Sequence, residues 1–160
     1  MTKCFGSLVA IITTDFEALY AYKRGDYQRC LQSSTRNVDT LLYAVDPSSV
    51  LALSEFIQLM DDDIVALTAL TLIVNPGCRK HSIYVSITQL ILSLYLMTQC
   101  HLKLHRSLKS LTLILDYIKV AQRRHPPRFT MDHLVLKLAK RKTVSYVRNK
   151  VSDPVRQAYM

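Results

Sequence analysis

The sequence predicts an all-α protein, and three observations carry that prediction. The chain has 160 residues, enough for one ordinary domain with a core of its own. Only three glycines and five prolines occur, so turns are few and the elements between them must be long. Apolar residues recur at three- and four-residue steps, the spacing of one helix face. We expect a single helical domain over residues 1–151 and a flexible tail over residues 152–160.

The first helical hairpin is predicted around the stretch YAYKRGDYQRCLQ. A helix over residues 14–23 is expected to end at Gly25, because glycine adopts a positive φ without steric cost. Asp26 is a good N-cap for a second helix over residues 27–43. Pro47 then closes the hairpin, since proline cannot continue a helix.

The middle of the chain is predicted to hold three helices. A short one is expected near residues 48–60, and an apolar one follows the aspartates at 61–63, where a helix N-terminus favours negative charge. The third lies in residues 82–100, nineteen residues without a charge, which is close to the length of a membrane span. Because serines, threonines and glutamines interrupt this run, we favour a central helix buried on most sides.

The last third of the chain is predicted to form two further helices. Residues 101–107 are the break before a helix that reaches Arg124. The apolar stripe of that helix consists of Leu108, Leu111, Leu115 and Ile118. Pro126-Pro127 stops it, Thr130 can cap its successor, and a basic helix follows over residues 131–150.

Cysteine usage and the start of the chain indicate an intracellular, cytoplasmic protein. The first residues lack the features of a signal peptide. The four cysteines lie far apart, without a CxxC pair, and are expected to be reduced and packed in the core: Cys4, Cys30, Cys78 and Cys100.

Charge is divided unequally along the chain. Residues 1–77 have a balance of −4, while residues 78–160 have a balance of +13. Such asymmetry can steer an acidic partner or a nucleic acid to one end, or hold neighbouring helices of the molecule together.

Small residues surround the predicted glycine turn. Ala18 and Ala21 precede it and Cys30 follows it, and small residues let two antiparallel helices approach closely while Tyr27 fills the space between them. In this respect AYKRGDYQRCL resembles the tetratricopeptide repeat, a two-helix unit of about 34 residues. A second, weaker hairpin of this kind can be placed on residues 86–124, without a glycine at its turn. The resemblance implies antiparallel hairpins stacked as a short, irregular solenoid.

The same resemblance implies a non-enzymatic adaptor that binds a peptide or helix of another protein, which could be acidic. In the resembled family the first helix of each hairpin lines the concave face. The corresponding groove residues are Asp15, Leu19, Tyr22, Lys23, Tyr95, Gln99, Leu102 and Lys103. Leu19, Tyr22 and Tyr95 could equally be core residues, because helix periodicity cannot separate two apolar faces.

No catalytic or cofactor motif is found in the sequence. GxSxG, the P-loop, the dinucleotide glycine pattern and HExxH are all missing, so we expect neither an enzyme nor a bound cofactor. Cys78 and His81, with Cys100 and His105, are zinc-ligand types. A helix about 30 Å long separates the two pairs, so no metal site is expected.

Basic residues gather toward the C-terminus. The predicted basic patch consists of Arg123, Arg124, Arg128, Lys137, Lys140, Arg141, Lys142, Arg148 and Lys150. It could be a solvated surface, contact an acidic protein, or bind a nucleic acid or another anionic surface, and AKRK at 139–142 could direct nuclear import. Because Tyr146 is the only aromatic residue within the last predicted helix, base stacking has little support, and nucleic-acid binding is the alternative function.

Overall fold

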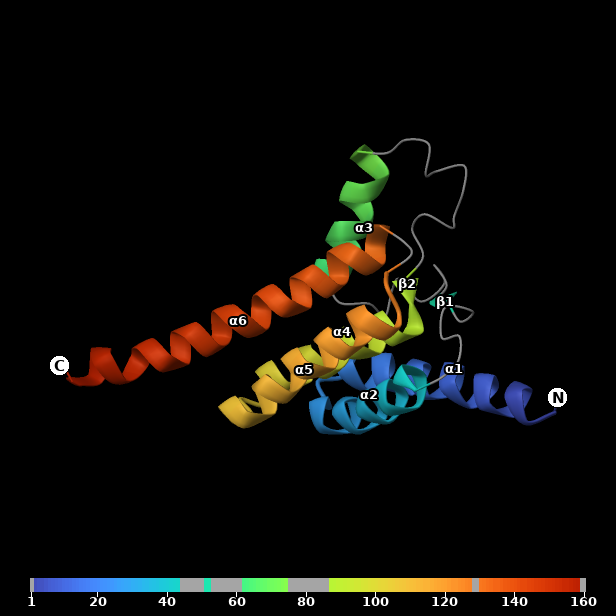
Figure 1. The fold of residues 1–160 in the computed structure, drawn as a ribbon, viewed down its shortest axis with the longest axis horizontal. Helices are drawn as coiled ribbons and strands as arrows, with labels where there is room; N and C mark the ends of the chain where they lie inside the picture. The colour runs from blue at the N-terminus through green and yellow to red at the C-terminus, as the bar shows by residue number, and fades with distance from the viewer. Residues whose placement is uncertain (1, 44–50, 53–61, 75–86, 128–129, 159–160) are drawn as a thin grey trace.

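The computed structural model describes residues 2–43, 51–52, 62–74, 87–127 and 130–158. In these ranges the chain forms six helices and two short strands (Figure 1). In chain order they are α1 (Thr2–Lys23), α2 (Tyr27–Leu42), β1 (Leu51–Ala52), α3 (Asp62–Val74), β2 (Ile87–Thr88), α4 (Gln89–Lys103), α5 (Leu108–Arg124) and α6 (Thr130–Ala158). The strands pair antiparallel, with Leu51 opposite Thr88. The all-α prediction is therefore confirmed.

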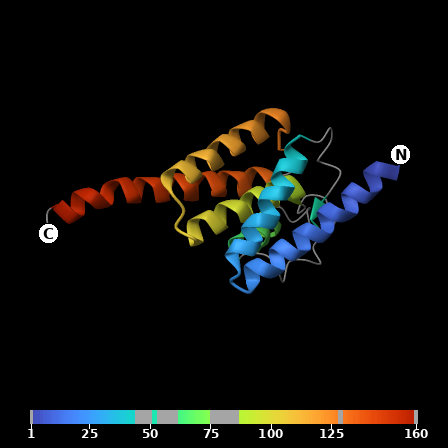
Figure 2. The ribbon, with the colours of Figure 1, turned by 90° about the horizontal axis from the view of Figure 1, so that it is seen from below.

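Helix α4 is the centre of the molecule and packs against α1, α2, α5 and α6 (Figures 1 and 2). Every residue from Gln89 to Cys100 is buried, which explains why this segment carries no charge: an ion on any face would lose its hydration. The buried central helix is thus confirmed over these residues. Residues 87–88 form strand β2 instead, and residues 82–86 lie outside the described ranges. No helix in the described part of the chain is long and apolar enough to cross a membrane.

Helices α1 and α2 form the predicted hairpin. Gly25 has a φ of 78°, the left-handed conformation expected of it. Its N–H donates to the Tyr22 carbonyl (3.0 Å), and the Asp26 N–H donates to the Ala21 carbonyl (2.9 Å). The Asp26 carboxylate accepts the Arg29 N–H at 3.2 Å and so caps α2 as predicted.

Helices α4 and α5 are joined by a turn with the same hydrogen bonds. The His105 N–H donates to the Leu102 carbonyl (3.2 Å), and the Arg106 N–H donates to the His101 carbonyl (3.0 Å). This pair of bonds, six-to-one and five-to-two, defines the Schellman motif at a helix end. The left-handed residue here is His105, with a φ of 50°. Ser107 caps α5 by accepting the Ser110 N–H at 3.3 Å.

Helices α5 and α6 cover α4 from the other side and are separated by Pro126-Pro127, as predicted. In α5 the buried residues are Leu111, Ile114, Ile118 and Ala121. Leu108, predicted to belong to this stripe, is 43% exposed because it lies in the first turn, beyond the end of the interface. In α6 the buried apolar residues are Met131, Val135, Leu136 and Ala139, all in its first half.

The predicted elements differ from the structure in three further places. Helix α1 begins at Thr2 rather than at residue 14, and Asp15 lies inside it with polar partners in the core. A helix was expected near residues 48–60, but Leu51–Ala52 form strand β1, which pairs with β2. The rest of that range and Pro47 lie outside the described ranges.

The third place is the end of the last helix. Helix α6 continues past residue 150 to Ala158, and the arginine, glutamine and alanine at its end are residue types that favour helix. Whether the segment 152–160 is flexible stays a prediction.

Candidate functional site

An open groove of about 710 Å³ lies where the ends of three helices meet the middle of α6. Tyr22 at the end of α1, Asp62 and Asp63 at the start of α3, and Gln99, Leu102 and Lys103 at the end of α4 line one part of it. Helix α6 supplies the rest, with Arg141, Lys142, Ser145, Tyr146 and Asn149. The lining therefore combines two aromatic rings, a leucine, amide and hydroxyl groups, and charges of both signs. We call this site the α6 groove.

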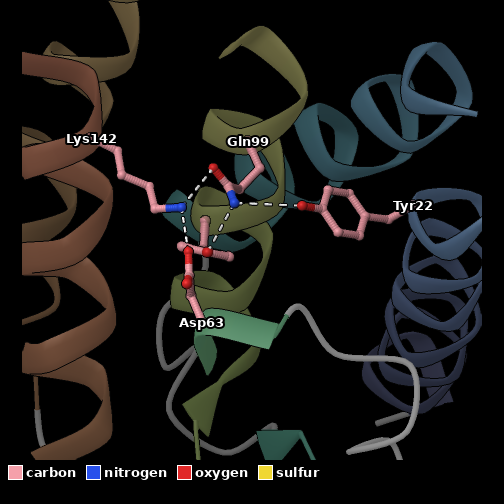
Figure 3. Close-up of polar contacts among 5 residues, drawn as sticks. Tyr22, Asp63, Gln99 and Lys142 are labelled. Atoms are coloured by element: carbon pink, nitrogen blue, oxygen red, sulfur yellow. Dashed lines mark hydrogen bonds and ion pairs between the residues drawn. The ribbon is translucent and has the colours of Figure 1, made fainter. Parts of the chain in front are cut away.

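The floor of the α6 groove is a polar network around Gln99 (Figure 3). The Gln99 Nε2 donates to the Tyr95 hydroxyl (3.0 Å) and to the Tyr22 hydroxyl (3.4 Å). Its Oε1 accepts from the Lys142 Nζ at 3.5 Å. Because Gln99 is only 5% exposed, these partners satisfy an amide that would otherwise be costly to bury. The network joins α1, α4 and α6 at one point.

The wall formed by α6 is held in place by Tyr146. The Tyr146 hydroxyl is hydrogen-bonded to the His105 Nδ1 at 3.0 Å, and the two rings stack with centroids 6.3 Å apart. On the same face of α6, the Lys150 ammonium lies 5.2 Å from the centroid of the Tyr146 ring. The turn between α4 and α5 thus fixes one side of the groove.

The acidic first turn of α3 lies at the edge of the groove. The Asp63 carboxylate forms a short ion pair with the Lys142 ammonium, and the side chains are 50% and 28% exposed. Asp62 is fully exposed and lies 3.9 Å from the Lys23 ammonium. As predicted, Asp62 and Asp63 occupy a helix N-terminus, whereas Asp61 lies outside the described ranges. Their cationic partners come from α1 and α6.

The predicted groove residues divide into two groups. Tyr22, Gln99, Leu102 and Lys103 line the α6 groove, and Lys23 is exposed beside it. The others are core residues rather than an exposed surface: Asp15 and Leu19 are each 2% exposed and Tyr95 is 0% exposed. Asp15 and Leu19 were misplaced because α1 packs against both α2 and α4, so two of its faces are buried. Tyr95 was misplaced because α4 is buried on every side.

Asp15 belongs to a buried polar cluster between three helices. Its Oδ1 accepts from the Asn37 Nδ2 of α2 and, at 2.9 Å, from the Ser93 Oγ of α4. Its Oδ2 is buried and accepts no hydrogen bond from the described residues. Burial raises the pKa of Asp15 from 3.8 to about 7, against the opposing effect of the two hydrogen bonds. The carboxyl group is therefore near its titration midpoint at neutral pH.

The predicted basic patch does not form one surface. Lys137, Lys140, Arg141 and Arg148 share the solvent face of α6, while Lys142 and Lys150 point to the opposite side, toward Asp63 and Tyr146. Arg123 and Arg124 are exposed at the end of α5, where the Arg124 guanidinium lies 5.0 Å from the centroid of the Tyr43 ring. Arg128 lies outside the described ranges.

Sequence reasoning missed five lining residues: Asp62, Asp63, Ser145, Tyr146 and Asn149. A signal for part of this set exists, because Lys142, Tyr146 and Asn149 recur at four- and three-residue steps and so share one face of a helix. No comparable signal exists for Asp62 and Asp63. Only the packing of α3 against α6 brings them to the groove.

Cys30 and Cys100 are both free and buried at the interface of α2 and α4. The hydrogen bond with Cys30, together with burial, raises the pKa of the Cys100 thiol. The Cys100 thiol is therefore held in its neutral form, whereas the same hydrogen bond lowers the pKa of the Cys30 thiol against the opposing effect of burial. Within the described part of the chain, no three His, Cys, Asp or Glu side chains converge on a position that could hold a metal ion.

No protein-family model matches the chain, and no curated protein or solved structure is significantly similar to it.

Proposed function

We propose that this chain is a non-enzymatic protein-interaction module that binds a peptide or helix of another protein in the α6 groove. One observation carries the proposal: an open groove whose lining combines two tyrosines and a leucine with amide and charged groups from four helices. Tyrosine and arginine are the residues that most often dominate binding at protein interfaces. Polar groups around an apolar centre can bind the main chain of a peptide and fix its orientation.

The arrangement of the helices supports a short, irregular solenoid of hairpins like those of tetratricopeptide repeats. The α1–α2 and α4–α5 hairpins end their first helices with the same hydrogen bonds. Tyr22 and Tyr27 make an edge contact across the first turn, with ring centroids 5.6 Å apart, where the resemblance expects an aromatic residue. Helix α3 and the β1–β2 pair lie between the two hairpins in sequence, which makes the array irregular.

The groove can be tested by selecting peptides from a random displayed library on the full chain. The variant Arg141→Glu/Ser145→Glu places two negative charges at exposed lining positions. Lys119→Glu/Thr112→Glu makes the same charge change on the exposed face of α5 and is the matched control. Selected peptides should lose at least about tenfold in affinity for the groove variant and keep their affinity for the control. Peptides that bind both variants equally would contradict the proposal.

A second candidate function is binding of a nucleic acid or another anionic surface by α6. The observation that favours it is the solvent stripe of Lys137, Lys140, Arg141 and Arg148 on a helix whose C-terminal half extends beyond the other helices (Figures 1 and 2). Binding to phosphates would weaken by orders of magnitude between low and moderate salt, whereas docking in the groove would weaken far less. A salt titration with a single-stranded oligonucleotide, on wild type and on Lys137→Glu/Arg148→Glu, separates the two functions.

A further inference from the structure

The acidic first turn of α3 occupies the cationic side of the α6 groove. The groove and its immediate edge carry four basic side chains: Lys23, Lys103, Arg141 and Lys142. Two of them are paired with α3, Lys142 with Asp63 and Lys23 with Asp62. Among the described residues, Lys103 and Arg141 form no ion pair, and both are exposed. The chain thus supplies its own carboxylates to two of these four basic side chains. The other two can bind carboxylates of a partner.

The Asp63–Lys142 pair is the stronger of the two contacts. The Lys142 ammonium is also bound to the Gln99 Oε1 (3.5 Å) and lies 6.0 Å from the centroid of the Tyr95 ring, so its position is fixed by the floor of the groove. A cation held in this way presents a defined site for one carboxylate. Asp63 shows which chemical group that site accepts.

Helix α3 is attached through one face, and the side chains of Asp62 and Asp63 can leave the groove by rotation without movement of the helix backbone. Ile64 is fully buried, and the Thr71 hydroxyl donates to the Met131 sulfur of α6 at 3.3 Å. On the opposite face Leu70, Ile73 and Val74 are 56–73% exposed. The ion pairs made by Asp62 and Asp63 lie in partly or fully exposed positions, where such contacts are individually weak.

Resting on the proposed function, we infer that the partner of the α6 groove is an acidic peptide segment, and that Asp62 and Asp63 are an internal competitor for it. A carboxylate of the partner replaces Asp63 at Lys142, while further carboxylates bind Lys103 and Arg141 at the rim. The side chains of Asp62 and Asp63 then rotate away from the groove, while the buried Ile64 holds the helix in place. Affinity is set by the difference between two carboxylate contacts, one within the chain and one from the partner.

The test uses the full chain and a short fluorescein-labelled oligoglutamate peptide, measured by fluorescence anisotropy. Asp62→Asn/Asp63→Asn removes the internal carboxylates, and asparagine keeps a residue type suited to a helix N-terminus. This variant should bind oligoglutamate about threefold to tenfold more tightly than wild type, the range expected from losing two exposed ion pairs. Lys103→Gln/Arg141→Gln should weaken binding by a similar factor.

The matched control is Glu17→Gln/Asp116→Asn, which makes the same change in net charge at exposed positions outside the groove. Its affinity should stay within about twofold of wild type, because neither residue lines the groove and salt screens exposed charges. An equal gain in both double variants would overturn the inference, since net charge alone would explain it. The inference would also be overturned if an oligonucleotide bound more tightly than oligoglutamate and its binding depended on Lys103 and Arg141.

Side-chain NMR gives a second, independent measurement. On adding oligoglutamate, the carboxylate carbon shifts of Asp62 and Asp63 should move toward those of a Lys142→Gln variant, while the amide shift of Thr71 stays unchanged. Unchanged carboxylate shifts would show that Asp62 and Asp63 are not displaced. Oligoglutamate can fail these tests while displayed peptides still lose affinity for Arg141→Glu/Ser145→Glu. In that case the α6 groove binds peptides as proposed, and only the inference that Asp62 and Asp63 compete with an acidic partner is wrong.

Discussion

Helices α1 and α4 end with the same pair of backbone hydrogen bonds, yet the residue that adopts the left-handed conformation is Gly25 in one turn and His105 in the other. Glycine enters this conformation without a steric cost. For a residue with a Cβ atom the cost is about 1–2 kcal/mol. The first turn is therefore specified locally, by one residue. The second must be stabilised by contacts from elsewhere in the molecule.

The compensating contacts of the second turn come from α6 and α2. The His105 ring is hydrogen-bonded to the Tyr146 hydroxyl and stacks on its ring, and the Arg106 guanidinium donates to the Gln28 Oε1 at 2.9 Å. Because Tyr146 lines the α6 groove, the strained turn and the candidate binding site share a residue. The comparison teaches that the first turn is specified by its own residues, whereas the second depends on the docking of α6.

The largest expected effect concerns how the first hairpin is attached to α4. Asp15 of α1 is protonated more readily in the folded chain, where its pKa is about 7, than in the unfolded chain, where it is 3.8. Its stabilising contribution is therefore fully present below pH 3.8 and is lost as pH rises through about 7. The loss is of the order of 4 kcal/mol at most. Urea unfolding across this pH range measures it.

Asp15→Asn imitates the protonated carboxyl and still accepts hydrogen bonds from Asn37 and Ser93. Its free energy of unfolding should lack this pH dependence and exceed that of wild type at neutral pH. The exposed Asp116→Asn is the control and should follow wild type. Parallel pH profiles for wild type and Asp15→Asn would show that Asp15 does not couple the hairpin to pH.

A smaller effect is expected at the first turn itself. Gly25→Val should destabilise the fold by about 1–2 kcal/mol, because a branched side chain resists the left-handed conformation. A Cβ at this position would meet no atom within 4 Å, so the cost comes from the backbone and not from a clash. Gly25→Asn should cost less, since asparagine tolerates this conformation. A wild-type melting temperature for Gly25→Val would refute the locally specified turn.

The second turn should respond differently to glycine. His105→Gly relieves the strained backbone but loses the contact with Tyr146, so we expect a net change below about 0.5 kcal/mol. Tyr146→Phe should cost about 0.5–1.5 kcal/mol in wild type and close to nothing in the His105→Gly background. Equal costs in both backgrounds would show that the two residues do not act together, and the contrast between the turns would be lost.

Labelling of the buried cysteines should show that the interface joining the two hairpins opens only rarely. Cys30 of α2 and Cys100 of α4 are 0% exposed. In a Cys4→Ser/Cys78→Ser background, a thiol reagent should label them at least about a hundredfold more slowly in the native chain than in urea. Labelling at the unfolded rate would mean that α2 and α4 separate readily, and that neither hairpin is docked as described.

Much of the fold follows from local sequence. The scarcity of turn residues, the uncharged stretch, Gly25 with Asp26, and Pro126-Pro127 all act through backbone conformation or burial of a whole segment. Both breaks were located correctly, and the buried central helix was correct over Gln89–Cys100, although residues 87–88 form a strand. The site was only half predicted. Tyr22, Gln99, Leu102 and Lys103 line the groove, but Asp15, Leu19 and Tyr95 are core residues. Periodicity indicates that a helix face is apolar without indicating which neighbour covers it.

By itself, the sequence determined that this protein is helical, where its first turn lies, and that its central helix is buried. These properties depend on φ preferences and hydration, which act over a few residues. Only the tertiary structure decided that His105 would adopt a glycine-like conformation, that Asp15 would be buried beside Ser93, and that Asp63 would meet Lys142. Each of these depends on residues 41 to 79 positions apart in the chain, whose contact is set by how whole helices pack. No local sequence pattern specifies a contact between residues so far apart in the chain.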